Sequence, residues 1–161
     1  MAESIQEQVA AKMESLLAAI VGDDGTTFWY TPMVIRTHSI DLGILEGGFK
    51  TIYAIAPDEE ESTEESSGRF EKVTRLVLML ARRHDSDDSH HGAKAPLRHT
   101  EQNRMIHDVD RALLGDTTLG GLVDNFEIPR RLQNADDVWV EGWAVVMCDV
   151  QATYSALSTV P

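Results

Sequence analysis

The sequence has few of the residues that would tie it to an oxidising compartment or to nucleic acid. Its single cysteine, Cys148, cannot form an intramolecular disulfide and lies within an apolar pattern. Lysine and arginine together number 14, against 27 aspartates and glutamates, and the net charge is -13. A tight sheath on DNA is not expected, because such binding depends on basic side chains that neutralise phosphates. We expect folding in the cytosol rather than oxidative export.

Long apolar runs and a secretory leader are also missing. The longest unbroken apolar runs, such as Leu76–Ala81, are far below the roughly 20 residues that a membrane helix needs. No basic segment followed by an apolar one opens the chain, so we expect neither secretion by a leader nor a membrane span. The length of 161 residues and the 42% hydrophobic content predict one domain, residues 1–161, with one core.

Two segments have the apolar spacing of amphipathic helices. In Ile5–Val21, apolar side chains recur at three- and four-residue steps, and Gly22 supplies a stop. A second apolar stripe runs through Leu97–Leu114, with Pro96 at its start and Gly115 at its end. Both helices must pack their apolar side against another element.

Strand patterns fill much of the remaining chain. The predicted strands and extended segments are Thr27–Thr37, Phe49–Ala56, Phe70–Arg83, Leu122–Ile128 and Val138–Tyr154. Pro57 and Pro129 are expected to end the second and fourth of these, because proline cannot donate to a ladder. The centre of the third is apolar on both pleat faces, which is typical of a central strand covered on two sides.

These elements predict an α+β domain with a small mixed or antiparallel sheet of four to five strands and two amphipathic helices packed on one face. No third amphipathic helix is available for the other face, where we expect Trp139, Trp143, Val77 and Met79. We therefore predict that a partner subunit covers this face. Isolated exposed aromatics as ordinary surface, or a local fold-back of the chain, are the alternatives.

Two hydrophilic arms flank the apolar third strand. The first arm, residues 58–68, contains Asp58, Glu59, Glu60, Glu61, Glu64 and Glu65 with serine and threonine between them. The second arm, residues 84–95, contains Asp87 and Asp88 among other aspartates and histidines. Neither arm can bury enough apolar surface to offset the entropy of ordering, so we predict that both are mobile loops.

The second arm also holds the main candidate metal ligands. They are His84, Asp85, Asp87, Asp88, His90 and His91, all residue types that bind divalent ions. Their spacing fits neither a helical His-Glu-x-x-His motif nor an EF-hand, and no second cysteine is present for a zinc clamp. A solvated loop is the simpler interpretation, so we predict no metal, no cofactor and no enzymatic activity. A small metal-dependent hydrolase that uses this loop is the alternative.

The element order and one local motif resemble the tail terminator, or tail completion, proteins of long-tailed bacteriophages. The order is an N-terminal helix, a hairpin region, the strand "KVTRLVLMLARR", a helix ending in "IHDVDRALLGDTTLGGLV" and the closing strand "VEGWAVVMCDVQATYSA". The motif comprises Asp108, Val109, Ala112 and Leu113, then Asp116, Leu119, Gly120 and Gly121, with a late Tyr154. The likeness covers most of the chain by element order and is sharp over Ile106–Val123.

This resemblance implies assembly rather than chemistry. Such proteins form a ring, as a rule a homo-hexamer, that caps the tail tube, ends its polymerisation and presents the surface joined by the head. The implied partners are the tail tube protein and a head-side connector or stopper protein, with DNA passing through the lumen without tight binding. The implied location is the head-proximal end of the tail in the virion, after synthesis in the host cytoplasm. A head-tail connector or another neck protein is the neighbouring alternative.

In such a ring, the two arms would reach a neighbouring subunit, the tube or the head, and would become ordered on docking. The residues expected at these interfaces are Asp58, Glu59, Glu60, Glu61, Glu64, Glu65, Asp87, Asp88, Trp139 and Trp143. The acidic balance fits the same role, because negative walls around a channel repel DNA phosphates.

Overall fold

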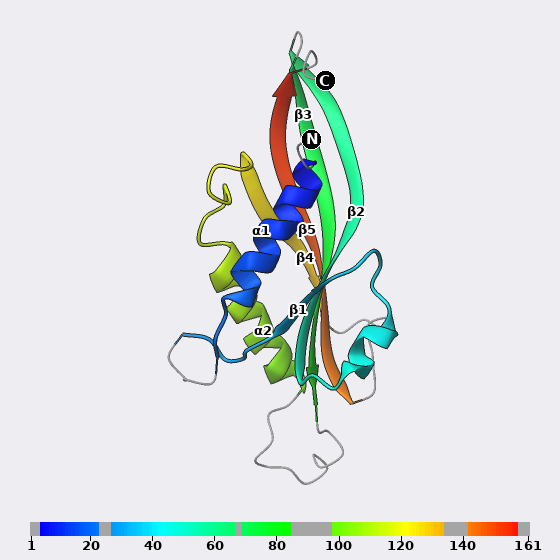
Figure 1. Ribbon diagram of the computed structural model, residues 1–161. Coiled ribbons are helices and arrows are strands. Elements are labelled where there is room, and N and C mark those ends of the chain that lie inside the picture. Colours follow the sequence, from blue (N-terminus) through cyan, green and yellow to red (C-terminus); the bar gives the residue numbers. More distant parts are fainter. Residues whose placement is uncertain (1–3, 23–26, 67–68, 85–97, 134–141, 158–161) are drawn as a thin grey trace.

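The computed structural model describes residues 4–22, 27–66, 69–84, 98–133 and 142–157, without the side chains of 59–66, 69–70 and 156–157. Its helices are α1 (Ile5–Ala18), α2 (Arg98–Leu113) and a 3-10 helix, η1 (Leu42–Gly47). Its strands are β1 (Met33–Arg36), β2 (Thr51–Ser66), β3 (Arg69–Arg83), β4 (Asn125–Leu132) and β5 (Trp143–Leu157). They form one mixed sheet in the order β1-β2-β3-β5-β4, with β1 and β2 parallel and the other pairs antiparallel (Figure 1). The predicted α+β class is confirmed.

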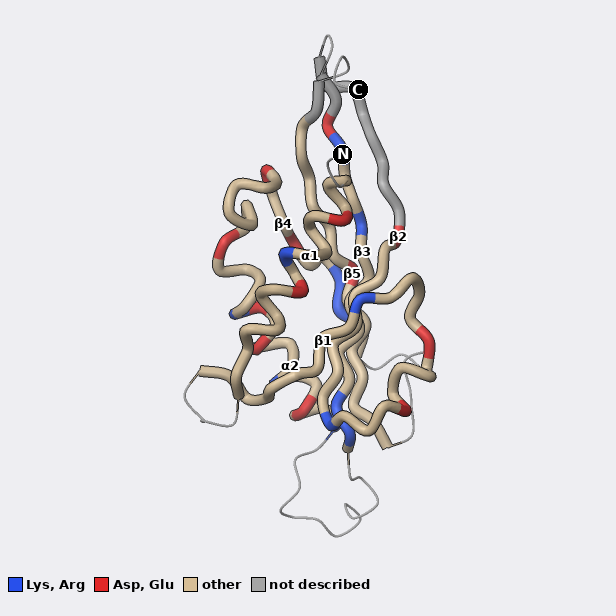
Figure 2. The backbone as a smooth tube through the Cα atoms, in the orientation of Figure 1, with Lys and Arg blue, Asp and Glu red and all other residues tan. Residues whose placement is uncertain are grey.

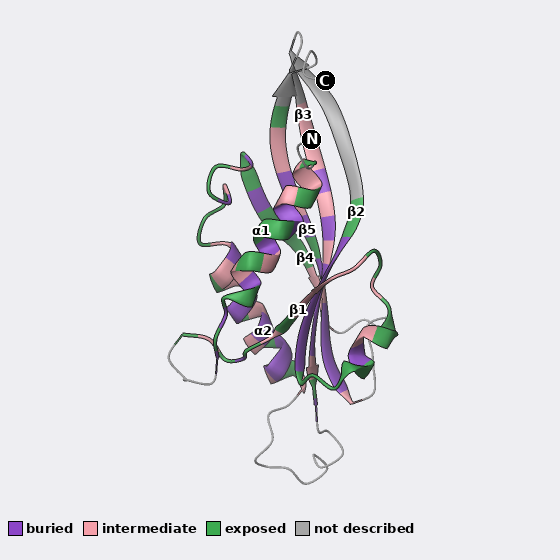
Figure 3. Cartoon of the chain, viewed as in Figure 1, coloured by how far each residue is buried: buried purple, intermediate pink, exposed green. Residues whose placement is uncertain are grey.

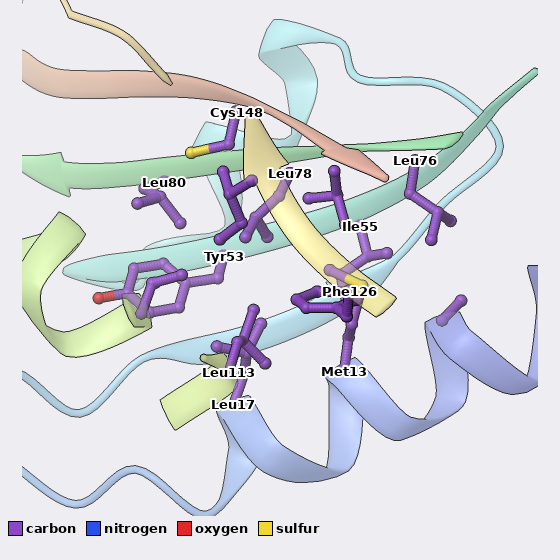
Figure 4. Close-up of a cluster of buried hydrophobic side chains, with 14 of the residues drawn as sticks. Met13, Leu17, Tyr53, Ile55, Leu76, Leu78, Leu80, Leu113, Phe126 and Cys148 are labelled. Atoms are coloured by element: carbon purple, nitrogen blue, oxygen red, sulfur yellow. The ribbon is translucent and has the colours of Figure 1, made fainter. Parts of the chain in front are cut away.

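The main core lies between the sheet and helices α1 and α2, which cover the same face (Figure 1). α1 begins after Ser4, whose hydroxyl accepts a hydrogen bond from the N–H of Glu7 and satisfies a free donor of the first turn. Fully buried side chains of this core include Met13, Leu17, Tyr53, Leu78 and Phe126 (Figure 4), together with Met105 of α2. Within the described part of the chain, no helix has the length and apolar character that a bilayer span requires.

Cys148 lies in this core, on β5. Burial raises the pKa of its thiol to about 12. Because the thiolate is the nucleophilic form, this cysteine has little reactivity near neutral pH in the folded protein.

The connection between β1 and β2 covers part of the opposite face. Trp143 is only 7% exposed there and belongs to a second core cluster with Leu45 of η1 and Met79 of β3. The prediction that a partner subunit must cover Trp143 is therefore wrong, and a local fold-back of the chain is what covers it. The 3-10 helix η1 is too short for its residues to show an amphipathic period, so the sequence did not predict this cover. Trp139 lies outside the described residues.

Both prolines that were expected to end strands lie inside them. Pro57 is within β2 and Pro129 is within β4, and the pairing register shifts directly after the first and around the second. The sequence-based strand ends at these residues are therefore wrong. β4 is an edge strand, and β1 ends at Arg36, before the level of Pro57. A proline at an open edge leaves no ladder donor missing.

The acidic arm is a strand over residues 58–66. This segment is the second half of β2, and its backbone pairs with β3 from Glu60 opposite Thr74 to Ser66 opposite Arg69. The predicted mobile loop is therefore wrong for residues 58–66, while 67–68 and most of the second arm, 85–95, lie outside the described residues. Ladder hydrogen bonds join backbone groups whatever the side chains are, and β3 is held by β5 on its other side.

The far ends of β2, β3 and β5 form a three-stranded ribbon, comprising residues 58–66, 69–75 and 150–157. It extends beyond the ends of the helices (Figure 1). Figure 3 shows that burial is densest in the body, and that half-buried and exposed positions are more frequent along the coloured parts of β3 and β5 in the ribbon. The ribbon is therefore an extension of a domain whose core lies below it.

Candidate functional site

β2 has a strand on only one side along its ribbon segment. β1 pairs with β2 from Met33 opposite Ile52 to Arg36 opposite Ile55, whereas β3 pairs with β2 as far as Ser66. Among the strands that the structure describes, none lies beside residues 58–66 on the β1 side. The result is a long open edge, which is a template for pairing with another chain.

The backbone groups on this open edge follow from the register. The N–H of Thr37 donates to the carbonyl of Ile55, so the backbone groups of Ile55 face β1. Two residues of β2 oppose one of β3 between the Pro57 and Glu60 pairs, and this bulge shifts the alternation by one residue. Beyond the bulge, the N–H and C=O of Glu60 and Ser62 therefore face the open side.

A groove of about 400 Å³ lies where β1 ends, directly before the open edge. Its lining includes Ala10 and Glu14 of α1, the end of β1 with the two residues after it (36–38), residues 55–57 of β2 and Leu76 of β3. The groove's base is thus defined by the buried apolar side chains of Ala10, Ile55 and Leu76, within a lining that is otherwise largely polar. It is contiguous with the open edge at Pro57.

Charge on the rim of the groove is unbalanced. The guanidinium of Arg36 is ion-paired with the carboxylate of Glu7 and lies 3.8 Å from that of Glu14. These side chains are 30%, 50% and 42% exposed, so the pairs contribute little stability. One arginine facing two glutamates leaves a negative rim. Asp58 is exposed where the ribbon begins, but it lines a different hollow, with Arg75 and Arg130. Figure 2 shows the acidic and basic positions along the described chain.

A second notable region is a buried polar cluster between α2 and the sheet. The carboxylate of Asp108 is fully buried and accepts hydrogen bonds of 2.9–3.0 Å from the backbone N–H groups of Trp29 and Tyr30. Burial raises the pKa of Asp108, and these two hydrogen bonds oppose the shift. The arrangement attaches the segment before β1 to α2.

The same cluster includes charged and aromatic side chains from the end of β3. The guanidinium of Arg82 lies 3.7 Å from the ring centroid of Tyr30 and donates a 2.6 Å hydrogen bond to the hydroxyl of Thr51. The imidazole Nδ1 of His84 lies 3.3 Å from the carboxylate of Glu101, and both side chains are buried. Burial raises the pKa of Glu101, while His84 and Arg82 oppose the shift.

Gln102 completes the attachment of α2 to the sheet. Its amide donates 2.8 Å hydrogen bonds to the backbone carbonyls of Gln133 and Val145. This cluster was not predicted from the sequence, although Glu101, Gln102 and Asp108 flank Met105 on the buried side of α2. These polar residues within the apolar stripe of a helix are the sequence feature from which the cluster could have been predicted. Asp108, Glu101 and Gln102 each have partners within the cluster, and these contacts indicate a structural role. Two buried polar atoms, the hydroxyl of Tyr30 and the Nε of Arg82, have no hydrogen-bond partner among the described residues.

Replacing Glu101 with glutamine is expected to weaken the dependence of stability on pH. The folded pKa of Glu101 is above its ordinary value of 4.5, so between the two values the folded protein holds a proton that the unfolded chain has released. This carboxyl therefore contributes less stability as pH rises through that window. Urea unfolding between roughly pH 4 and 7 measures the effect. The exposed Glu46→Gln is the control, and an unchanged pH profile in Glu101→Gln would contradict the expectation.

The candidate metal ligands are not brought together within the described residues. No group of three or more side chains that could hold a metal ion is present in that part of the chain. His84 contacts Glu101, whereas Asp85, Asp87, Asp88, His90 and His91 lie outside the described residues.

The residues expected at interfaces lie in different environments. Asp58 is exposed at the start of the ribbon, and Trp143 is buried within the chain. The backbones of Glu59, Glu60, Glu61, Glu64 and Glu65 belong to β2, and Trp139, Asp87 and Asp88 lie outside the described residues. The structure thus places the acidic arm, but not Trp143, on a surface open to partners. Comparison with known proteins assigns no family, since no family model and no curated protein sequence match this chain.

Proposed function

We propose that the protein is a structural virion component that forms a ring, a homo-hexamer by analogy with tail terminator proteins, on the end of a phage tail tube. In this role it ends tube polymerisation and provides the surface that joins the head. The observation that carries the proposal is the ribbon, an acidic extension with an open strand edge that projects from a domain with its own complete core. A surface of this kind suits docking to other chains.

The order of elements supports the proposal. Helix α1, strands β1 to β3, helix α2 and strands β4 and β5 follow one another along the chain in the order on which the resemblance to tail terminators is based. The expected hairpin after the first helix is wrong, because β1 and β2 pair in parallel.

The turn after α2 explains the composition of the motif that resembles tail terminator proteins. The carboxylate of Asp116 accepts hydrogen bonds from the N–H groups of Thr118 and Gly120, at 3.0 and 2.8 Å. Leu119 is buried with a φ of 50°, and Gly120 and Gly121 follow at 73° and 89°. Positive φ favours glycine, so the Leu-Gly-Gly run places one apolar side chain in the core and leaves two flexible positions for the turn.

The distribution of apolar surface is also consistent with assembly. Leu42, the first residue of η1, Phe49, after η1, and Trp29, before β1, are large apolar residues that remain 61%, 42% and 45% exposed. They lie outside the ribbon, so they offer further contact surface to ring neighbours. The net charge of -13 suits a channel wall that DNA crosses without binding.

A tube-growth experiment tests the proposal. Purified tail tube protein is polymerised with and without this protein, and tube lengths are measured by electron microscopy. We expect shorter tubes of narrower length distribution in its presence. The control is a variant in which Glu60–Val73 is replaced by a two-residue Asn-Gly turn, which shortens the ribbon and keeps the body. It is expected to fold, by circular dichroism, without arresting growth.

Two results would count against the proposal. Tubes of unchanged length at saturating protein would contradict a terminator function. Binding to purified heads in place of tubes would support the head-tail connector or neck alternative instead.

A further inference from the structure

We propose that the open edge of β2 and the adjoining groove take an added strand from a different protein, an extended segment rich in lysine and arginine. The inference deepens the proposed function, on which it rests for the biological setting. The added strand would lie beside residues 58–66 of β2, on the side that β1 occupies lower in the sheet. It would thus extend the line of β1 along the ribbon.

The backbone supplies the pairing groups for such a strand. The N–H and C=O of Glu60 and Ser62 face the open side, and β3 already holds the other side of β2 in register. An edge fixed in this way is preorganised, so an incoming strand gains backbone hydrogen bonds without ordering β2.

The groove supplies an apolar surface at the start of the same path. Ala10, Ile55 and Leu76 line it from α1, β2 and β3, and the segment that follows β1 borders it. One end of an added strand can therefore bury apolar side chains against this base. The remainder of the strand then runs along the open edge.

Charge decides the chemistry of the partner. The β2 edge carries the carboxylates of Asp58, Glu59, Glu60, Glu61, Glu64 and Glu65 within eight residues. The rim of the groove adds Glu7 and Glu14 against the single Arg36. Opposite charges on neighbouring strands stabilise pairing and like charges oppose it, so the complementary strand is basic.

The same charges argue against a second copy of this chain as the occupant. Two β2 edges side by side would bring their carboxylates together, which acts against edge-to-edge association. The other edge strand, β4, carries Arg130 and Arg131, but the guanidinium of Arg131 is ion-paired with Asp110 at 2.5 Å. The partner is therefore a different, basic protein.

Fluorescence anisotropy with a defined peptide tests this inference on the full chain. The probe is a fluorescein-labelled peptide of alternating lysine and valine, about nine residues long, to match the length of the open edge. We expect saturable binding that Ser62→Pro weakens about tenfold, because it removes a backbone donor from the open edge. Ser62→Ala, which keeps that donor, is the matched control and is expected to bind within about twofold of the original.

A modified probe tests the same hydrogen bonds from the ligand side, in case Ser62→Pro disturbs folding. The peptide is N-methylated at four central amides, which keeps its charge and removes its donors. We expect this peptide to lose most of its affinity. We also expect the unmodified peptide to slow amide hydrogen exchange at Glu60 and Ser62.

Three outcomes of these binding experiments would overturn the inference. Equal affinity for the methylated peptide would show attraction by charge alone, and absence of binding would show that the edge takes no basic strand. Self-association that Ser62→Pro abolishes would assign the edge to a second copy. If these tests fail while tubes are still capped, the inference falls and the terminator function stands. If the peptide binds the edge and tubes grow unchanged, the terminator function falls.

Discussion

Replacing Asp108 with alanine is expected to lower the free energy of unfolding by about 3–5 kcal/mol. The carboxylate is fully buried and accepts the backbone N–H groups of Trp29 and Tyr30 at 2.9–3.0 Å. Its removal leaves the N–H groups of Trp29 and Tyr30 without this acceptor, and the bond to Tyr30 is buried. An unsatisfied buried donor carries a desolvation cost. Urea unfolding at neutral pH, followed by tryptophan fluorescence, measures the loss.

Asp110→Ala is the matched control for this prediction. Asp110 lies on the same helix, its carboxylate is 37% exposed, and its ion pair with Arg131 is also partly exposed. Its loss should cost no more than about 1 kcal/mol. Asp108→Asn, which keeps one acceptor, should fall between the two. Equal stability of Asp108→Ala and Asp110→Ala would show that the buried carboxylate does not anchor the segment before β1.

Replacing Gly22 with alanine is expected to cost about 3 kcal/mol, although the change adds a single methyl group. A Cβ at this position would lie 2.3–2.5 Å from backbone atoms of Tyr30. Relief of this steric clash requires movement of the backbone. Two hydrogen bonds oppose that movement: the N–H of Tyr30 donates to the carboxylate of Asp108, and the N–H of Gly22 donates to the hydroxyl of Thr31. The midpoint of urea unfolding measures the effect.

Gly115→Ala is the control for Gly22→Ala. A Cβ at Gly115 meets only the carbonyl oxygen of Arg111, at 3.7 Å, which is an ordinary contact. We expect a change within about 0.5 kcal/mol for this variant. If Gly22→Ala unfolds at the same urea concentration as the unchanged protein, that result would contradict the close approach of Gly22 to the backbone of Tyr30.

The elements with strong local signals were predictable from the sequence. α1 and α2 have continuous apolar stripes and clear ends, and both formed within a few residues of the expected bounds. β3 was expected to be covered on two sides. Leu78 faces the helices in one core cluster and Met79 faces η1 in the other, which confirms that expectation.

The features that were missed depend on contacts between distant segments. Trp143 is covered by η1, which is too short to show a helical period and is placed there only by the parallel pairing of β1 with β2. Pro57 stays within β2 because β1 has already ended at its level. The site of Asp108 likewise requires the chain at Trp29 and Tyr30 to lie against α2, 78 or 79 residues away in sequence.

The acidic arm shows why composition alone misled. Six carboxylates within eight residues predicted a mobile segment, yet the backbone of residues 58–66 is held by β3, and β3 in turn by β5. The negative charge of this segment does not prevent it from forming a strand but affects what can pair with its open edge. It keeps an open strand edge from pairing with its own copy and favours a basic partner.

Labelled protein on tail tubes tests the terminator function most directly. Full-length protein with a gold-labelled affinity tag is mixed with purified tail tubes and imaged by negative-stain electron microscopy. We expect label at one end of each tube, with ring-shaped densities in end-on views. Label scattered along tube walls, or tube ends left bare by a protein that sediments as a monomer at every concentration, would contradict a ring that caps the tube.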